Sequence, residues 1–158
     1  MNNLVQDLTE DLKILKATRA NILKLLSEFS LQQVNQVPEG LNNNLAWNAG
    51  HIWVTQKLLT YGLSGQETGL SAELIGAYKK GSKPGATISA EDWAVIIDGL
   101  TNSVDELEKD LVGLTWAEHK PYTTSYGVTI AHVSKGVRFN NTHEGMHLGT
   151  MIALSKLV

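Results

Sequence analysis

Apolar residues recur every three or four positions along four long segments of this chain. The first segment runs from Leu4 to Phe29, and three acidic residues lie near its start, where a helix dipole favours them. A spacing of three and four is typical of an amphipathic helix with one buried face. The apolar positions of this segment are Leu4, Leu8, Leu12, Leu15, Ile22, Leu26 and Phe29.

The second predicted helix starts after Asn44, a favoured capping residue, and extends to about Leu63, where Gly62 and Gly65 end it. It is apolar on two stripes, so we expect it to pack against neighbours on more than one side. The two stripes are Leu45, Ala49, Ile52, Leu59 and Leu63, and Trp47, Val54 and Leu58.

The third and fourth helices complete the pattern. Ser89 and Asp92 resemble a capping box and open an apolar series that continues to Leu114. Thr129 is the expected cap of a last helix that runs close to the C-terminus. The intervening stretches are rich in Gly, Pro and polar residues, with at most a short helix around residues 72–79, and no strand is predicted.

These elements predict one all-α domain over residues 1–158, a four-helix bundle. The connector at 66–88 is longer than the roughly ten extended residues needed to cross back along a helix. The second and third helices can therefore run parallel with a long crossover between them, although length alone does not require it.

Composition narrows the classes of function. The chain has no cysteine and a net charge of -3 without a basic cluster. Nucleic acid and anionic membranes are therefore poor partners, and any metal must bind imidazole, carboxylate or water. No apolar run approaches the roughly 20 residues that span a bilayer, and the N-terminus does not resemble a signal peptide. We expect a cytoplasmic protein.

The segment His143-Glu144-Gly145-Met146-His147 places two imidazoles on one helix face, about 6 Å apart. An arbitrary pair at this spacing is more often part of a core or a surface. Here Asn140 and Met151 lie one turn before and after the pair, which directs the histidines into the bundle. Two uncompensated buried imidazoles would be costly, and a shared metal ion removes that cost.

His51 is the candidate for a third ligand because it lies on the second helix with the Trp47 stripe. A lone histidine there is more often a hydrogen-bonded core residue, but the inward-facing pair favours the ligand interpretation. His132 is about 16 Å along the axis from His143, too far to share the ion. His119 falls in a loop, where we expect it to be solvated.

The same five residues spell the zinc-peptidase motif, in which the glutamate is a general base. The rest of that signature is missing, since Thr150 and Ala153 replace the downstream Gly and His of one class, and no acidic residue follows Glu144. Glu144 is thus a candidate base or a residue that orients a histidine. Trp47 and Asn140 are candidates to line the pocket, and Trp47 can equally be a core residue.

The segments Asn44–Ile52 and His143–Gly149 together resemble the DinB/YfiT-like family of bacterial four-helix metalloproteins, over essentially the whole chain. Thr150 departs from the family pattern, in which a Gln often follows the Gly. The matching positions are Trp47, Gly50, His51, His143, His147 and Gly149.

The resemblance implies an up-down-down-up bundle, often a homodimer, with a three-histidine site open to water or substrate. Known members transfer low-molecular-weight thiols such as bacillithiol, use mycothiol in isomerisation, or are described as hydrolases. The first hypothesis is therefore a metal-dependent transferase or hydrolase acting on a small molecule, with zinc or nickel and a thiol cosubstrate. The alternative is a non-catalytic bundle that a metal stabilises or that binds a small ligand.

Overall fold

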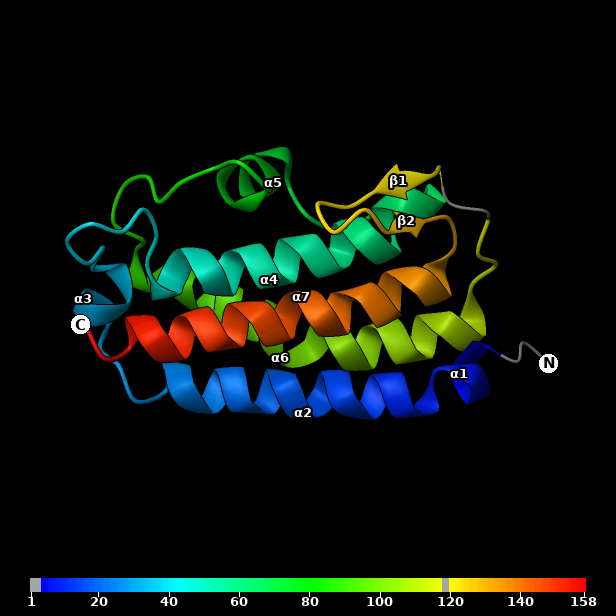
Figure 1. Ribbon diagram of the computed structural model, residues 1–158, viewed down its shortest axis with the longest axis horizontal. Helices are drawn as coiled ribbons and strands as arrows, with labels where there is room; N and C mark the ends of the chain where they lie inside the picture. Colours follow the sequence, from blue (N-terminus) through cyan, green and yellow to red (C-terminus); the bar gives the residue numbers. More distant parts are fainter. Residues whose placement is uncertain (1–3, 118–119) are drawn as a thin grey trace.

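Four long helices lie side by side in the computed structural model, which describes residues 4–117 and 120–158 (Figure 1). They are α2 (Thr9–Leu26), α4 (Leu45–Thr60), α6 (Ala90–Gly113) and α7 (Val133–Leu154). The all-α prediction is confirmed. Shorter helices join them: α1 (Leu4–Asp7), α3 (Leu31–Asn35), the 3-10 turn η1 (Gly62–Ser64) and α5 (Ala72–Tyr78).

The four long helices pack in a square arrangement, in which α2 and α4 each contact both α6 and α7. In Figure 1, α2 and α7 run from right to left, whereas α4 and α6 run from left to right. Contacts between α4 and α6 agree, since Gln56 donates to the Ser103 carbonyl and Tyr61 donates to Asp110 farther along both helices. The connection through α5 therefore crosses back along the outside of α4.

Helix α4 is buried along nearly its whole length, as its two apolar stripes predict. It contacts α6 and α7 within the bundle and α3 and α5 outside it. Its contact with α6 is close because Gly99 has no side chain, and a Cβ atom there would overlap the indole of Trp53. His51, one of the three predicted ligands, thus lies on a helix that is enclosed along nearly its whole length.

Several predicted boundaries are wrong. The first segment is two helices interrupted at Leu8, and α2 ends at Leu26. The prediction that Thr129 caps the last helix is also wrong, because Thr129 belongs to a strand and His132 is the cap, with its Nδ1 accepting from the Ser134 amide at 3.3 Å.

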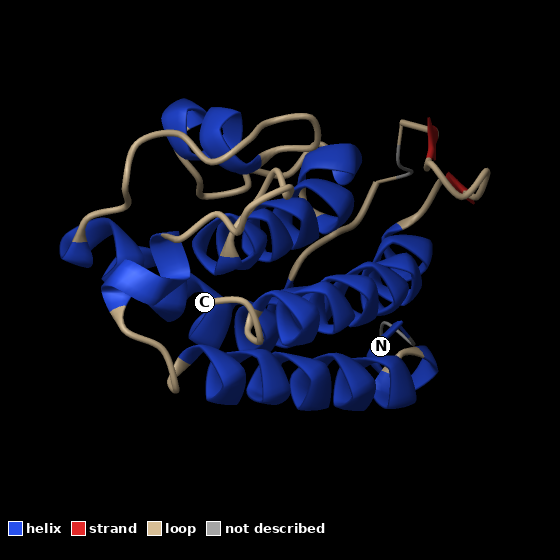
Figure 2. Ribbon diagram, turned by 60° about the vertical axis from the view of Figure 1, so that its left-hand side comes forward, coloured by secondary structure: helices blue, strands red, loops and turns tan. Residues whose placement is uncertain are grey.

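A two-stranded hairpin, which the sequence analysis did not predict, precedes α7. Strand β1 (Tyr122–Thr123) pairs antiparallel with β2 (Thr129–Ile130). Figure 2 shows this hairpin outside the helices, beyond the first turn of α7. No helix in the described part of the chain is long and apolar enough to cross a membrane.

Candidate metal centre

Three histidines from two helices meet inside the bundle. His51 comes from α4, and His143 and His147 lie one turn apart on α7. One ring nitrogen of each lies within 4.8 Å of the other two, and the Nε2 atoms of His51 and His143 are 3.1 Å apart. We call these residues the histidine cluster. All three are buried, each at most 9% exposed.

Hydrogen bonds fix the orientation of two of these rings. The Nδ1 atom of His51 lies 2.6 Å from the carbonyl oxygen of Tyr78, and Nδ1 of His147 lies 2.8 Å from Oδ1 of Asn48. Because these oxygens only accept hydrogen bonds, each Nδ1 carries the proton. Nε2 of each of these rings therefore carries the lone pair. In metal-ligating histidines a protein oxygen typically holds the other ring nitrogen in the same way.

The cluster is built from neutral imidazoles. Burial lowers the pKa of His143 to about 3, with His147 and His51 adding repulsion. Burial likewise lowers the pKa of His147 to about 4. The pKa of His51 is also lowered by burial, against the opposing effect of the Tyr78 carbonyl. At neutral pH the three rings are uncharged, and this is the state in which histidine binds metal.

The arrangement fits a divalent ion. Two nitrogens bound tetrahedrally to zinc at 2.0–2.1 Å are about 3.3 Å apart, close to the 3.1 Å between the Nε2 atoms of His51 and His143. The donor set of three imidazoles leaves at least one coordination position for a non-protein ligand. The residues present therefore fit a transition-metal ion, and they suit zinc and nickel equally.

The crossover segment contributes to the site through Tyr78, the last residue of α5. The ring of Tyr78 lies directly on Gly50, where a Cβ atom would overlap it. This close approach brings the Tyr78 carbonyl within reach of His51 in the next position of α4. The glycine before His51 thus has a steric reason, since it lets α5 dock and hold the His51 ring.

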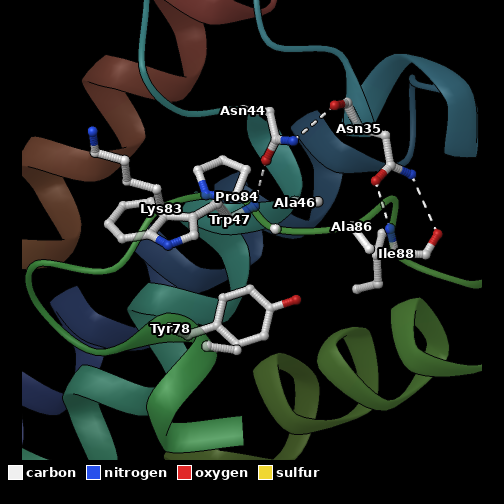
Figure 3. A pocket seen from close by; sticks show the side chains of 11 residues that line it. Asn35, Asn44, Ala46, Trp47, Tyr78, Lys83, Pro84, Ala86 and Ile88 are labelled. Atoms are coloured by element: carbon white, nitrogen blue, oxygen red, sulfur yellow. Dashed lines mark hydrogen bonds between the residues drawn. The ribbon is translucent and has the colours of Figure 1, made fainter.

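Trp47 supports the cluster from one side. Its ring stacks on His51 at 4.6 Å between centroids and 11° between planes, and its Nε1 donates to Ser82 at 3.0 Å. On another side Trp47 lines a separate cavity of about 190 Å³, shown in Figure 3 with Tyr78 and Lys83. Trp47 therefore contacts His51, a candidate metal ligand. It is not among the described residues that line the cavity at the three histidines.

Glu144 belongs to a second buried group. Its two carboxylate oxygens accept from Nε and Nη2 of Arg19, and one also accepts from Asn140 at 2.8 Å. The remaining donors of Arg19 bond to Gln56, Ser103 and the Leu100 carbonyl. The exposed fractions of Arg19 and Glu144 are 3% and 0%. We call Arg19, Gln56, Ser103, Asn140 and Glu144 the arginine cluster.

A cavity of about 180 Å³ opens beside the histidine cluster. All three histidines lie in its wall, together with residues of α4, α7, the hairpin and the segment after α5. Glu144 and Asn140 are absent from the described part of that wall. The other lining residues are Thr55, Leu59, Lys80, Tyr122, Thr124, Ser125, Tyr126, Phe139 and Met146.

The sequence profile of the DinB superfamily matches residues 14–151, which include all three histidines and the whole crossover. The chain belongs to the DinB superfamily. No curated protein matches it. Among the glycines of the family pattern in this DinB-superfamily chain, Gly50 is sterically required, whereas nothing lies within 4 Å of a Cβ atom placed at Gly149.

The residues singled out from the sequence separate into two groups. The structure brings His51, His143 and His147 together with Trp47 against them, and places Asn140 and Glu144 in the arginine cluster. His132 is the cap of α7, and His119 lies outside the described residues.

Sequence reasoning missed three residues of this DinB-superfamily site: Arg19, Asn48 and Tyr78. Arg19 had a visible signal, because it replaces an apolar residue between Leu15 and Ile22 on the buried stripe of the first helix. A charge at such a position needs a buried partner. Tyr78 acts through its backbone carbonyl and carries no signal of this kind.

Proposed function

We propose that this DinB-superfamily chain binds one divalent transition metal ion through Nε2 of His51, His143 and His147 and catalyses a reaction of a small molecule there. One observation carries the proposal: three neutral imidazoles converge in the wall of an open cavity. A site that only stabilised the fold would need a fourth protein ligand, and no described acid or further histidine joins the cluster.

The proposed chemistry is thiol transfer or hydrolysis. A zinc or nickel ion bound there would act as a Lewis acid that lowers the pKa of a bound thiol or water. The chain itself orients His51 and His147 through Tyr78 and Asn48 and gives the substrate a cavity on one side of the three rings. In transfer, the thiol sulfur bonds to an electrophilic carbon as the leaving group departs, and the thiol proton passes to solvent.

We propose a structural role for Glu144 rather than a role as proton acceptor. Both of its oxygens bond to Arg19, and it is fully buried away from the cavity wall. A general base must be within hydrogen-bond reach of the substrate proton, directly or through one water. This placement supports transfer or hydrolysis of small molecules over peptidase chemistry, in which the glutamate of the motif must reach the reacting water.

The proposal also covers the localisation, the oligomeric state and the partners of the protein. We expect a cytoplasmic homodimer that acts on a small molecule, without nucleic acid or membrane as a partner. The family resemblance supports the dimer, and the net charge of -3 supports the absence of nucleic acid. The mass of the untagged protein in solution, measured by light scattering, tests the dimer directly.

The first experiment measures metal content. Untagged wild type incubated with zinc or nickel should hold about one ion per chain by plasma mass spectrometry. His51→Ala and His147→Ala should hold almost none. The matched control is His132→Asn, because asparagine preserves the helix cap that alanine would remove at a cost of about 1 kcal/mol. An empty wild type, or equal loading of all four proteins, refutes the site.

Turnover measurements distinguish the enzyme hypothesis from the alternative of a non-catalytic bundle. The loaded wild type should conjugate a thiol to an electrophile, or hydrolyse a simple ester or amide, and His147→Ala should not. A loaded protein that turns over none of these substrates supports the alternative, a bundle that metal stabilises without catalysis.

A further inference from the structure

The described wall of the cavity beside the histidine cluster carries a positive charge and no negative charge. Lys80 is the one cationic side chain among the described residues that line the cavity, and no Asp or Glu is among them. Lys80 is exposed and, within the described chain, makes no ion pair of the kind that Lys13, Lys16 and Lys57 make. Its ammonium group is therefore available to a ligand in the cavity.

The position of Lys80 depends on the contact that orients His51. Tyr78 is held on Gly50 by close packing, and its carbonyl accepts from His51. Lys80 follows two residues later, so the same docking brings Lys80 to the cavity wall. The backbone of Lys80 is thus connected to the candidate metal ligand His51 through one short piece of chain.

Nothing in the described wall offsets positive charge. Imidazole ligands are neutral, so a divalent ion held by them would keep its full charge. Glu144, which adjoins His143 in the sequence, is bonded to Arg19 and lies outside the wall. The remaining polar lining consists of hydroxyl groups, which can donate to an anion: Thr55, Tyr122, Thr124, Ser125 and Tyr126.

We propose that the substrate of this site carries a carboxylate, which pairs with Lys80 while the reacting atom of the substrate faces the three histidines. This inference rests on the proposed function, since it assumes that the reaction occurs at the histidine cluster. At about 180 Å³ the cavity is smaller than the roughly 300–1,000 Å³ typical of ligand pockets, so it encloses only part of a drug-sized substrate.

A series of small thiols tests the pairing on the cobalt-loaded protein. 3-Mercaptopropionate, 2-mercaptoethanol and cysteamine are of similar size and carry an anionic, a neutral and a cationic group. Each can bind cobalt through sulfur, and the sulfur-to-cobalt absorption band reports binding without turnover. We expect the wild type to bind them in that order of decreasing affinity.

The variant Lys80→Gln should lower the affinity for 3-mercaptopropionate by about twofold to fivefold, as for one exposed ion pair, and leave 2-mercaptoethanol unchanged. Lys79→Gln is the matched control, because Lys79 is the neighbouring exposed lysine and does not line the cavity. It should behave as wild type.

The outcomes separate the two proposals. Equal affinities for the anionic and neutral thiols in wild type, or equal losses in Lys80→Gln and Lys79→Gln, overturn the role of Lys80 while leaving the metal site intact. Failure to bind cobalt at all would instead refute the proposed function, and this inference with it.

Discussion

Two buried polar groups lie next to each other in the middle of the bundle and differ in how their atoms are satisfied. In the arginine cluster, Nε, Nη1 and Nη2 of Arg19 each donate a hydrogen bond, and both carboxylate oxygens of Glu144 accept one. In the histidine cluster, His51 and His147 use Nδ1 for protein partners and direct Nε2 toward the other rings. His143 and Glu144 are neighbours in the sequence, yet each belongs to a different cluster.

The difference indicates which group stabilises the fold and which is suited to bind a ligand. A buried charge with partners from three helices needs nothing from outside the protein. In the histidine cluster the Nε2 atoms of His51 and His143 lie 3.1 Å apart, so a cation can bind between the rings. The low pKa values of His143 and His147, about 3 and about 4, disfavour the proton at neutral pH. The histidine cluster is therefore suited to hold a metal ion at neutral pH.

The largest effect should come from breaking the arginine cluster. Arg19→Met leaves the Glu144 carboxylate buried without its cation, which should lower the free energy of unfolding by about 3–5 kcal/mol in urea. Lys16→Met is the matched control on the same helix, because its partners are exposed and it should cost less than about 1 kcal/mol.

A second variant tests the cause of that loss. The double variant Arg19→Met/Glu144→Gln removes both charges and should recover most of the lost stability. A cost for Arg19→Met as small as that for Lys16→Met would show that the pair does not hold the fold.

The next effect concerns the orientation of His51. Gly50→Ala should displace the Tyr78 ring and move its carbonyl away from His51, which should weaken zinc binding about 10-fold to 100-fold, measured by calorimetry. Gly145→Ala, on the exposed face of α7, should leave zinc binding unchanged and add about 0.5–1 kcal/mol of stability.

The double variant Gly50→Ala/Tyr78→Ala isolates the clash, since it removes the ring but keeps the carbonyl. It should recover much of the lost affinity. Unaltered zinc binding in Gly50→Ala would disprove the role assigned to the Tyr78 contact.

A smaller effect is the pH dependence that the histidine cluster gives to the free energy of unfolding of the metal-free protein. The unfolded chain protonates its histidines near pH 6.5, but His143 and His147 stay neutral in the fold until about 3 and about 4. Stability is therefore full above the unfolded pKa and falls as acid is added, by about 1 kcal/mol per histidine between pH 6.5 and 5.5. Urea unfolding at these two pH values measures the loss.

His143→Leu provides the comparison for this measurement, because it removes one of the buried histidines whose pKa is lowered. Its stability should fall by about 1 kcal/mol less than that of wild type over the same interval. An identical acid response in both proteins would contradict the neutral state assigned to His143.

The sequence predicted the parts of this molecule that depend on periodicity. The four long helices follow from apolar spacing, and the proximity of His143 and His147 follows from the four-residue step between them. Caps at Asn44 and Ser89 were correct because a side chain bonds to an amide three residues away, which is a local property.

Features that depend on distant partners were not predicted. The two strands of the hairpin have two residues each, which is too short to show an alternation of apolar and polar residues. Thr129 was therefore assigned to the wrong element. Arg19 finds Glu144 across the bundle, and Tyr78 presents a carbonyl that every residue possesses. Spacing along one helix shows which residues share a face, but the partner of that face depends on tertiary packing.

X-ray absorption of the zinc-loaded protein tests the central claim most directly, because it reports the atoms bound to the ion. We predict three imidazole nitrogens at about 2.0–2.1 Å with the remaining position filled by a light atom that exchanges with added thiol. The spectrum of the Glu144→Gln variant should be the same. A first shell with fewer than three imidazoles, or one that changes with Glu144→Gln, would contradict the separation of a ligand-binding histidine cluster from a structural arginine cluster.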